Sequence, residues 1–149
     1  MPQFSTTRLV PYSAQHMFDL VADIEKYPEF LPLCKDLEII KEYEQDGNSV
    51  LLANMEVVYK FINESFCTEV TLDKKEKIIE VKYIDGPFSY LDNKWQFYDI
   101  DELGSKVEFF IDYEFKSRML GIIMGEVFQR AFVKFAEAFE VRANNLYCG

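Results

Sequence analysis

The sequence has little of the material from which most catalytic and metal sites are built. It contains a single histidine, His16, and three widely spaced cysteines, Cys34, Cys67 and Cys148, with no C-x-x-C pair. One histidine leaves no supported Ser-His or Cys-His pairing. The cysteine spacing supports neither a disulfide framework nor a zinc site. We therefore expect no catalytic residues, no metal ligands and no required cofactor, and we expect the protein not to be an enzyme.

The chain also lacks clustered positive charge and a recognisable targeting segment. Its 16 lysines and arginines are scattered, and 26 aspartates and glutamates bring the formal net charge to −10. A nucleic-acid surface needs clustered cations that displace counterions, so direct DNA binding is not expected. Residues 1–10 have neither the basic and apolar regions of a secretory signal nor the Arg-rich character of a transit peptide. A cytoplasmic location is the expectation.

Aromatic residues, in contrast, are abundant. The 149 residues include 14 phenylalanines, 9 tyrosines and one tryptophan. A chain of this length is most simply one domain, residues 1–149, and it is long enough to bury a sizeable core. Aromatic side chains in this number suit either a large packed core or a cavity that holds an apolar ligand.

A long amphipathic helix is predicted over residues 117–147. Its apolar residues share one broad arc at 100° per residue: Leu120, Met124, Val127, Phe128, Ala131, Phe132, Phe135, Ala138 and Phe139. Ser117 stands where its side chain can cap the first open N–H groups. At about 1.5 Å per residue the helix reaches roughly 45 Å, so a large apolar surface must lie beneath it.

The first turns of this helix have two unusual features. Gly121 and Gly125 each cost about 0.8–1 kcal/mol relative to alanine, which favours either close packing on a strand or room for a ligand. Met119, Ile122 and Ile123 lie outside the apolar arc. They predict a second burial surface, formed by a loop of the same chain or by a partner.

The rest of the chain predicts strands around a short helical segment. Residues 3–10 form a first strand, Ser13 caps a helix, and a second helical turn follows at about 25–31. Six strands are then expected at 37–43, 50–59, 63–72, 77–85, 90–100 and 107–115. Short links between them imply an antiparallel sheet. The predicted fold class is α+β, with about seven strands curled around the C-terminal helix.

Residues 27–34 form an apolar stretch without periodicity. Such a loop is either buried as a plug or placed at a pocket mouth or a membrane contact. We expect it to meet the glycine-containing turns at residues 119–125.

Several strings of the sequence match a known family over essentially the whole chain. They lie at residues 10–13, 17–21, 27–34, 64–66, 85–88, 95–97, 115–118 and 138–140. In these strings the chain resembles the coenzyme Q-binding branch of the START-domain superfamily, a polyketide cyclase-like group whose bacterial relatives include ribosome-association toxins. One departure is Leu33, which stands where the family usually has tryptophan; the loop remains apolar.

The resemblance implies a helix-grip fold with two short helices after the first strand and a cavity between sheet and C-terminal helix. It implies ubiquinone (coenzyme Q) or a similar polyprenyl lipid as the bound ligand, and a lipid chaperone that supports respiratory electron transport or quinone biosynthesis. The alternative is a toxin-like regulator of ribosomal subunit joining, with the large subunit as partner; a cyclase-like enzyme is a third reading. The lipid-chaperone reading also implies transient contact with the inner face of the membrane.

The candidate ligand-binding residues combine inward-facing aromatic and methionine side chains with the apolar loop. They are Phe30, Leu31, Leu33, Met55, Tyr59, Phe66, Tyr83, Phe88, Trp95, Tyr113, Leu120, Met124 and Phe128.

Overall fold

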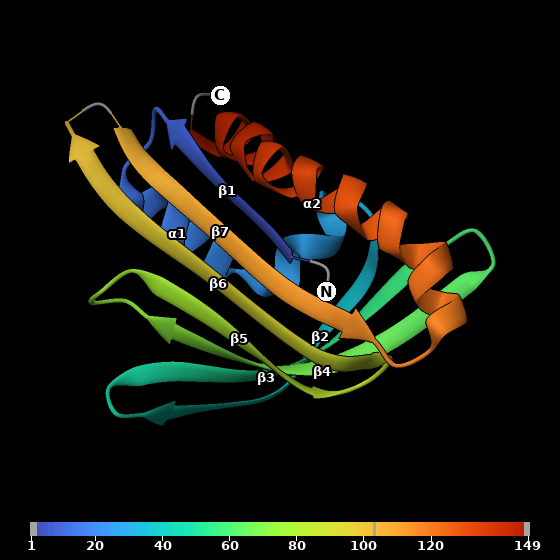
Figure 1. Ribbon diagram of the computed structural model, residues 1–149. Coiled ribbons are helices and arrows are strands. Elements are labelled where there is room, and N and C mark those ends of the chain that lie inside the picture. Colours follow the sequence, from blue (N-terminus) through green and yellow to red (C-terminus); the bar gives the residue numbers. More distant parts are fainter. Residues whose placement is uncertain (1–2, 103, 148–149) are drawn as a thin grey trace.

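The computed structural model describes residues 3–102 and 104–147 (Figure 1). The elements are β1 (Gln3–Val10), α1 (Ala14–Ala22), the 3-10 helix η1 (Ile24–Glu29), β2 (Cys34–Gln45), β3 (Asn48–Tyr59), β4 (Ile62–Asp73), β5 (Ile78–Asp85), β6 (Phe88–Asp101), β7 (Gly104–Phe115) and α2 (Arg118–Tyr147).

One curved sheet organises the fold. Its seven strands follow the order β1-β7-β6-β5-β4-β3-β2, and every neighbouring pair is antiparallel. The helix α2 runs along the concave side, where its backbone lies closest to β1, β7 and α1 (Figure 1). The predicted α+β helix-grip architecture is confirmed.

The short helices are set by local capping and by proline. Ser13 Oγ accepts a hydrogen bond from His16 N–H at 3.1 Å, which starts α1 as predicted. The second helical turn is a 3-10 helix that ends at Glu29, two residues earlier than predicted, and it contains Pro28. Because proline lacks an N–H group, this segment does not continue as an α-helix.

Five strands, β2, β3, β4, β6 and β7, begin earlier than the sequence pattern predicts, and in β2 and β6 a register shift follows the first residue. β2 begins at Cys34, which pairs with Val57, and the register shifts before Asp36. β6 begins at Phe88, which pairs with Phe115, and its register also shifts directly afterwards. These irregularities interrupt the two-residue periodicity, so the alternation seen in the sequence starts only after them.

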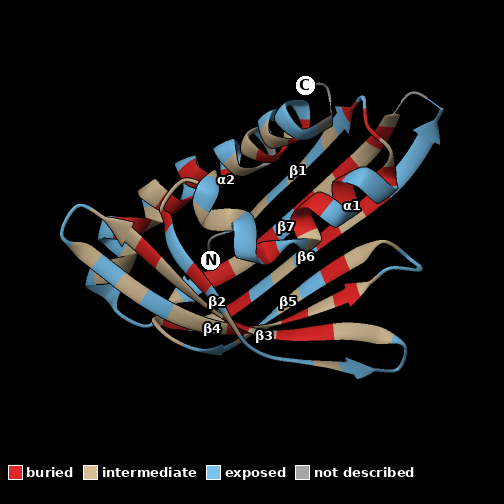
Figure 2. Cartoon of the chain, turned by 180° about the vertical axis from the view of Figure 1, so that it is seen from behind, coloured by how far each residue is buried: buried red, intermediate tan, exposed pale blue. Residues whose placement is uncertain are grey.

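β7 follows the predicted alternation. Val107, Phe109, Ile111 and Tyr113 are buried, whereas Phe110 is 38% exposed on the outer side. In Figure 2 buried and less buried residues alternate along the strands. The inner face of the sheet therefore supplies one wall of the interior.

α2 supplies the opposite wall. Ser117 Oγ accepts a hydrogen bond from Leu120 N–H at 3.1 Å, and the helix begins at Arg118. Its buried side chains that belong to the predicted arc are Met124, Phe128, Ala131, Phe132 and Phe139. No segment among residues 3–102 and 104–147 covers Met119, Ile122 and Ile123, which are all exposed. A covering loop of the same chain is thus ruled out within this part of the molecule.

The two helix glycines are not required for close packing. A Cβ added at Gly125 meets no atom within 4 Å, and one at Gly121 meets only Phe115, at 3.8 Å. The close-packing explanation for these glycines is therefore wrong.

Replacing Gly125 with alanine is expected to raise the free energy of unfolding by about 0.8–1 kcal/mol, because helix propensity improves and the methyl group meets nothing. Urea denaturation of the variant measures this. Gly86→Ala is the opposite control: Gly86 has φ +145°, and its added Cβ lies 2.5 Å from Phe66 Cβ, so stability should fall. A destabilised Gly125→Ala protein would contradict the open space at this position.

Candidate ligand-binding cavity

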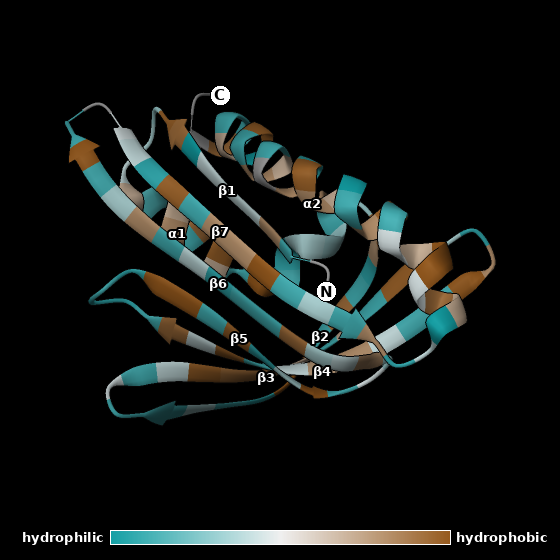
Figure 3. Ribbon diagram, in the orientation of Figure 1, coloured by the Kyte–Doolittle hydropathy of each residue, from teal (hydrophilic) through white to brown (hydrophobic). Residues whose placement is uncertain are grey.

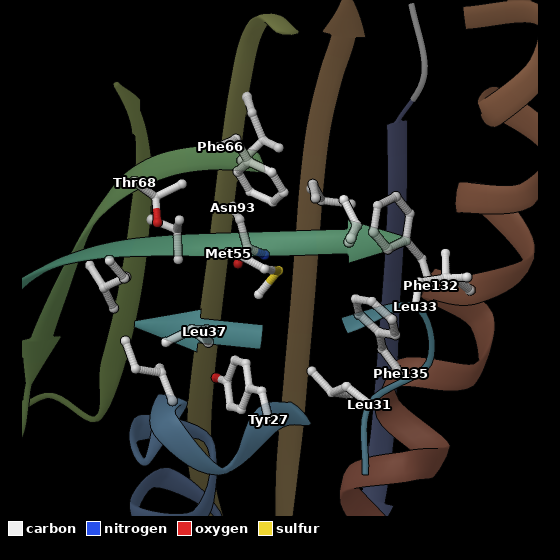
Figure 4. A pocket seen from close by; sticks show the side chains of 18 of the residues that line it. Tyr27, Leu31, Leu33, Leu37, Met55, Phe66, Thr68, Asn93, Phe132 and Phe135 are labelled. Atoms are coloured by element: carbon white, nitrogen blue, oxygen red, sulfur yellow. The ribbon is translucent and has the colours of Figure 1, made fainter. Parts of the chain in front are cut away.

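A cavity of about 120 Å³ lies between the concave face of the sheet and α2. Its walls are almost entirely carbon, from β2 to β7, η1, the loop after η1, and the middle of α2 (Figure 4). An apolar cavity of this kind favours an apolar guest over water, since water needs several polar partners.

Seven of the predicted ligand-binding residues line this cavity. They are Leu31, Leu33, Met55, Phe66, Phe88, Trp95 and Phe128. They come from the loop after η1, from β3, β4 and β6, and from α2, which are brought together only by the curvature of the sheet.

Three other predicted residues, all aromatic, lie behind or beside the wall. The Tyr83 hydroxyl accepts a hydrogen bond from Phe88 N–H at 3.1 Å, so it holds a wall residue from outside the cavity. Tyr113 is buried between β7 and α2, with its ring 5.4 Å from that of Phe132. Phe30 packs edge-on against Phe139, with ring centroids 5.1 Å apart. These three side chains support the cavity rather than line it.

The remaining three predicted residues lie toward the ends of their elements. Tyr59 and Leu120 are partly buried against the core, and Met124 is buried on α2. None of the three belongs to the cavity wall. Their ligand-binding role remains a prediction.

The ligand-site prediction missed several wall residues. Among them are Tyr27, Thr68, Asn93, Phe132, Phe135 and Phe139. The signals were present in the sequence: the three phenylalanines lie on the predicted apolar arc of α2, and Thr68 shares the inward parity of Phe66. Asn93 also lies on the same face of its strand as Trp95. Its polar side chain, however, gave no reason to expect it in an apolar wall.

Polar side chains interrupt the apolar wall at a few points. Asn93 Nδ2 donates to the Phe110 carbonyl at 2.8 Å, which fixes the orientation of the amide. Thr68 is buried on β4, and the Tyr27 hydroxyl donates to the Val21 carbonyl. Figure 4 shows Tyr27, Thr68 and Asn93 among the side chains that converge on the cavity. The wall can therefore offer hydrogen bonds to a mainly apolar ligand that carries polar atoms.

Trp95 is packed on several sides. Its ring lies 4.7 Å from that of Phe109 and 5.0 Å from that of Phe139, both edge-on. These contacts hold the indole as a rigid part of the wall, and it is the only tryptophan of the chain.

The loop after η1 acts as a plug beneath the C-terminal half of α2. Leu31 is buried and lines the cavity together with Leu33. Leu33 has φ +68°, and its carbonyl accepts a hydrogen bond from Val58 N–H at 3.0 Å. The Arg142 guanidinium lies 5.2 Å from the Phe30 ring centroid and pairs with Glu29 at 2.9 Å.

The predicted meeting of this loop with residues 119–125 is wrong. The loop follows α1, and the segment before α1 is tied to the far end of α2 by a hydrogen bond from the Tyr12 hydroxyl to Asn144 Oδ1. The loop therefore lies against Phe139 and Arg142, several turns away from Gly125.

Burial also raises the pKa values of groups around the cavity. It raises the pKa of Tyr113 to about 12, and burial followed by the nearby Asp36 charge raises the pKa of the Cys34 thiol to about 11. The pKa of Tyr27 is raised as well, first by burial and then by Cys34 and Asp23. These groups are neutral in the folded protein.

Alkaline pH is expected to destabilise the fold. The unfolded chain releases the Tyr113 proton near pH 10, whereas the folded chain holds it to about pH 12. The stabilisation is complete below pH 10 and is lost between these values, at about 1.4 kcal/mol per pH unit for each such group. Urea denaturation at a series of alkaline pH values measures the slope. Tyr113→Phe should make it shallower; an unchanged slope would contradict the assignment.

The curved sheet, the long helix and the apolar cavity between them define a helix-grip domain of the START type. The chain belongs to the polyketide cyclase / dehydrase and lipid transport family, whose model matches residues 10–140.

Relatives of two kinds are similar to the chain. The ribosome association toxin RatA of Escherichia coli K12 is 34% identical over 99% of this chain and 90% of its own length. The mitochondrial coenzyme Q-binding protein COQ10 of Dictyostelium discoideum is 29% identical over 95% of this chain and 68% of its own length.

Solved structures share the fold. The solution structure of the 18 kDa protein CC1736 from Caulobacter crescentus is 32% identical, with a TM-score of 0.81 over 100% of both chains. The Zhui aromatase/cyclase from Streptomyces has a TM-score of 0.79 at 16% identity over 99% of this chain and 98% of its own. At that identity the cyclase shows the fold alone.

Two features are absent from the described residues. None of the helices there is both long and apolar enough to cross a membrane. Nor do histidine, cysteine, aspartate and glutamate side chains gather there in a group of three that could hold a metal ion.

Proposed function

We propose that the protein binds ubiquinone or a similar polyprenyl quinone and serves as a lipid chaperone for quinone-dependent respiration or quinone biosynthesis. The observation that carries the proposal is the apolar cavity between sheet and α2, with polar side chains at a few points of its wall. An apolar ring that carries carbonyl oxygens fits that wall chemically.

The volume of the cavity limits its occupant to a single ring and excludes the whole lipid. A cavity of roughly 150 Å³ lined by apolar side chains is known to hold one benzene ring, and the volume here is about 120 Å³. The polyprenyl tail must therefore extend out of this volume.

Hydrogen bonding then orients the ring. Quinone carbonyls only accept hydrogen bonds, so they need donors in the wall. The Thr68 hydroxyl can donate one, and Asn93 keeps a second amide N–H beyond the one bonded to Phe110. Thr68 is buried among apolar side chains, where such a bond is strengthened.

Fluorescence of Trp95 provides the test, because quinones quench indole emission and this is the only tryptophan. Titration with a short-chain ubiquinone is expected to quench it saturably, whereas an isoprenoid alcohol of equal length should not. Thr68→Val, which keeps the shape and removes the hydroxyl, should weaken binding by about two- to tenfold, the worth of one hydrogen bond. Quenching that never saturates, as for free tryptophan in solution, would reject the proposal.

A second candidate function is association with the ribosome. It is favoured by the 34% identity to the ribosome association toxin over nearly the whole chain. A chain of net charge −10 is poorly suited to gripping RNA phosphates, so it would dock on ribosomal proteins. Co-sedimentation with large ribosomal subunits at low salt is the expected result for this candidate, and failure to sediment counts against it.

A further inference from the structure

One end of the molecule carries a group of large apolar side chains open to solvent. Phe61 is 86% exposed, Ile122 74%, Met119 71% and Ile123 41%. We call these four residues the apolar tip. Figure 3 shows hydrophobic segments in the first turns of α2 and beside the β3–β4 turn. Exposure of this kind on several neighbouring segments marks a contact surface.

The strand directions and two contacts place these segments at the same end of the sheet. The β3–β4 turn follows Tyr59, which pairs with Ile62. Further along that hairpin Phe66 lies against Gly86 of the β5–β6 turn. Lys116 N–H, at the start of the link to α2, donates to the Pro87 carbonyl of the same turn at 2.9 Å. All three connections therefore share one end (Figure 1).

The segments that carry the apolar tip contain cations and no acid, unlike the chain as a whole. Lys60 neighbours Phe61, and Lys116 and Arg118 precede Met119; residues 57–63 and 115–125 contain no acidic residue, although the chain carries −10. The nearest acids are Asp85, the last residue of β5, and Glu64, Glu114 and Glu126, which border the two segments in the sequence. The ion pairs found among the described residues involve none of the three cations.

From this pattern we propose that the apolar tip docks on an anionic lipid bilayer. Phe61, Met119 and Ile122 insert at the boundary between headgroups and acyl chains, and the three cations contact anionic headgroups. The acidic remainder of the molecule is repelled by the same surface, so only this end can face it.

The docking rests on the proposed function, because it brings the cavity to the source of its ligand. The elements that carry the tip also wall the cavity: Met55 and Phe66 lie on the β3–β4 hairpin, and Phe128 lies on α2 beyond Ile122. A lipid whose ring enters the cavity can then keep its tail near the bilayer.

Co-sedimentation of the full chain with quinone-free vesicles tests the docking alone. The protein is expected to bind vesicles of equal parts phosphatidylcholine and phosphatidylglycerol. Its binding to vesicles of phosphatidylcholine alone should be much weaker. Ile122→Asp should lower the partition coefficient at least about tenfold, since a charge is then forced into the headgroup boundary. Lys116→Glu with Arg118→Glu should abolish the preference for the anionic lipid. Val141→Asp, exposed on the far part of α2, is the matched control and should bind normally.

The outcomes separate docking from ligand binding. Ile122→Asp that loses vesicle binding, yet still shows quinone quenching of Trp95 in detergent, supports the proposal. Failure of the unaltered protein to bind anionic vesicles overturns it, whatever the quenching shows. Equal loss in the Val141→Asp control also overturns it. If Ile122→Asp leaves vesicle binding intact but removes co-sedimentation with large ribosomal subunits, the tip is a protein interface and the proposal is wrong.

Discussion

Phe88→Ala is expected to lower the free energy of unfolding by about 3–5 kcal/mol, the usual range for removing a fully buried phenylalanine. Phe88 has no exposed surface. Its ring stacks on Phe115 with centroids 4.8 Å apart and meets Phe66 edge-on at 5.3 Å. Because the cavity already lies beside it, the neighbours have little means of closing the space that the missing ring leaves. Urea denaturation measures the loss.

Phe110→Ala is the matched control for this substitution. It removes the same ring from the outer face of β7, where the side chain is 38% exposed. Its cost should stay below about 1 kcal/mol, as for most surface substitutions. A similar cost for both variants would show that Phe88 is not the centre of an aromatic cluster.

Ala53→Phe is expected to reduce quinone uptake more than tenfold while changing stability by less than about 1 kcal/mol. Ala53 is buried on β3 and faces the cavity. A phenyl group added there enters space that is otherwise empty. It therefore takes the place of the ligand without pushing neighbouring side chains aside. In a packed core the same enlargement costs about 1–3 kcal/mol. Trp95 quenching and urea denaturation measure the two quantities on one sample.

The control for this variant is Val133→Phe, which places a phenyl group on the exposed side of α2. Its uptake and stability should both remain close to those of the unaltered protein. If Ala53→Phe lowers stability by several kcal/mol and each folded molecule still takes up quinone, the ligand lies elsewhere.

The sequence predicted best where one periodic signal covers a whole element. β7 alternates as expected, and its inward residues Phe109 and Tyr113 are buried. Phe128 and Phe132 of α2 are buried on the predicted arc. In such segments one face is apolar along the full length, so burial determines both the element and its orientation.

Prediction failed where tertiary contacts decide the structure. Residues 27–34 have no periodicity, and their place is set by contacts with residues far away in the sequence, Phe139 and Arg142. The cavity could be predicted only in part. Inward parity identified Trp95 and Phe66, but parity cannot distinguish a wall residue from one that packs behind it, as Tyr113 does.

The exposed turn of α2 shows a further limit. Apolar residues in a sequence predict burial, but they do not identify the surface that covers them. Met119 and Ile122 were expected to be covered, and the described part of the chain leaves them open. The structure shows that the described part of this chain does not cover them, and this exposure is the basis of the proposed docking surface.

Mass spectrometry of solvent extracts tests the central claim most directly. The protein and its Ala53→Phe variant are incubated with vesicles that contain ubiquinone, recovered from them, and extracted with organic solvent. The account predicts quinone in near-stoichiometric amount from the unaltered protein and little from Ala53→Phe. Absence of quinone from both proteins, or equal amounts in both, would contradict the assignment of the cavity as the quinone site.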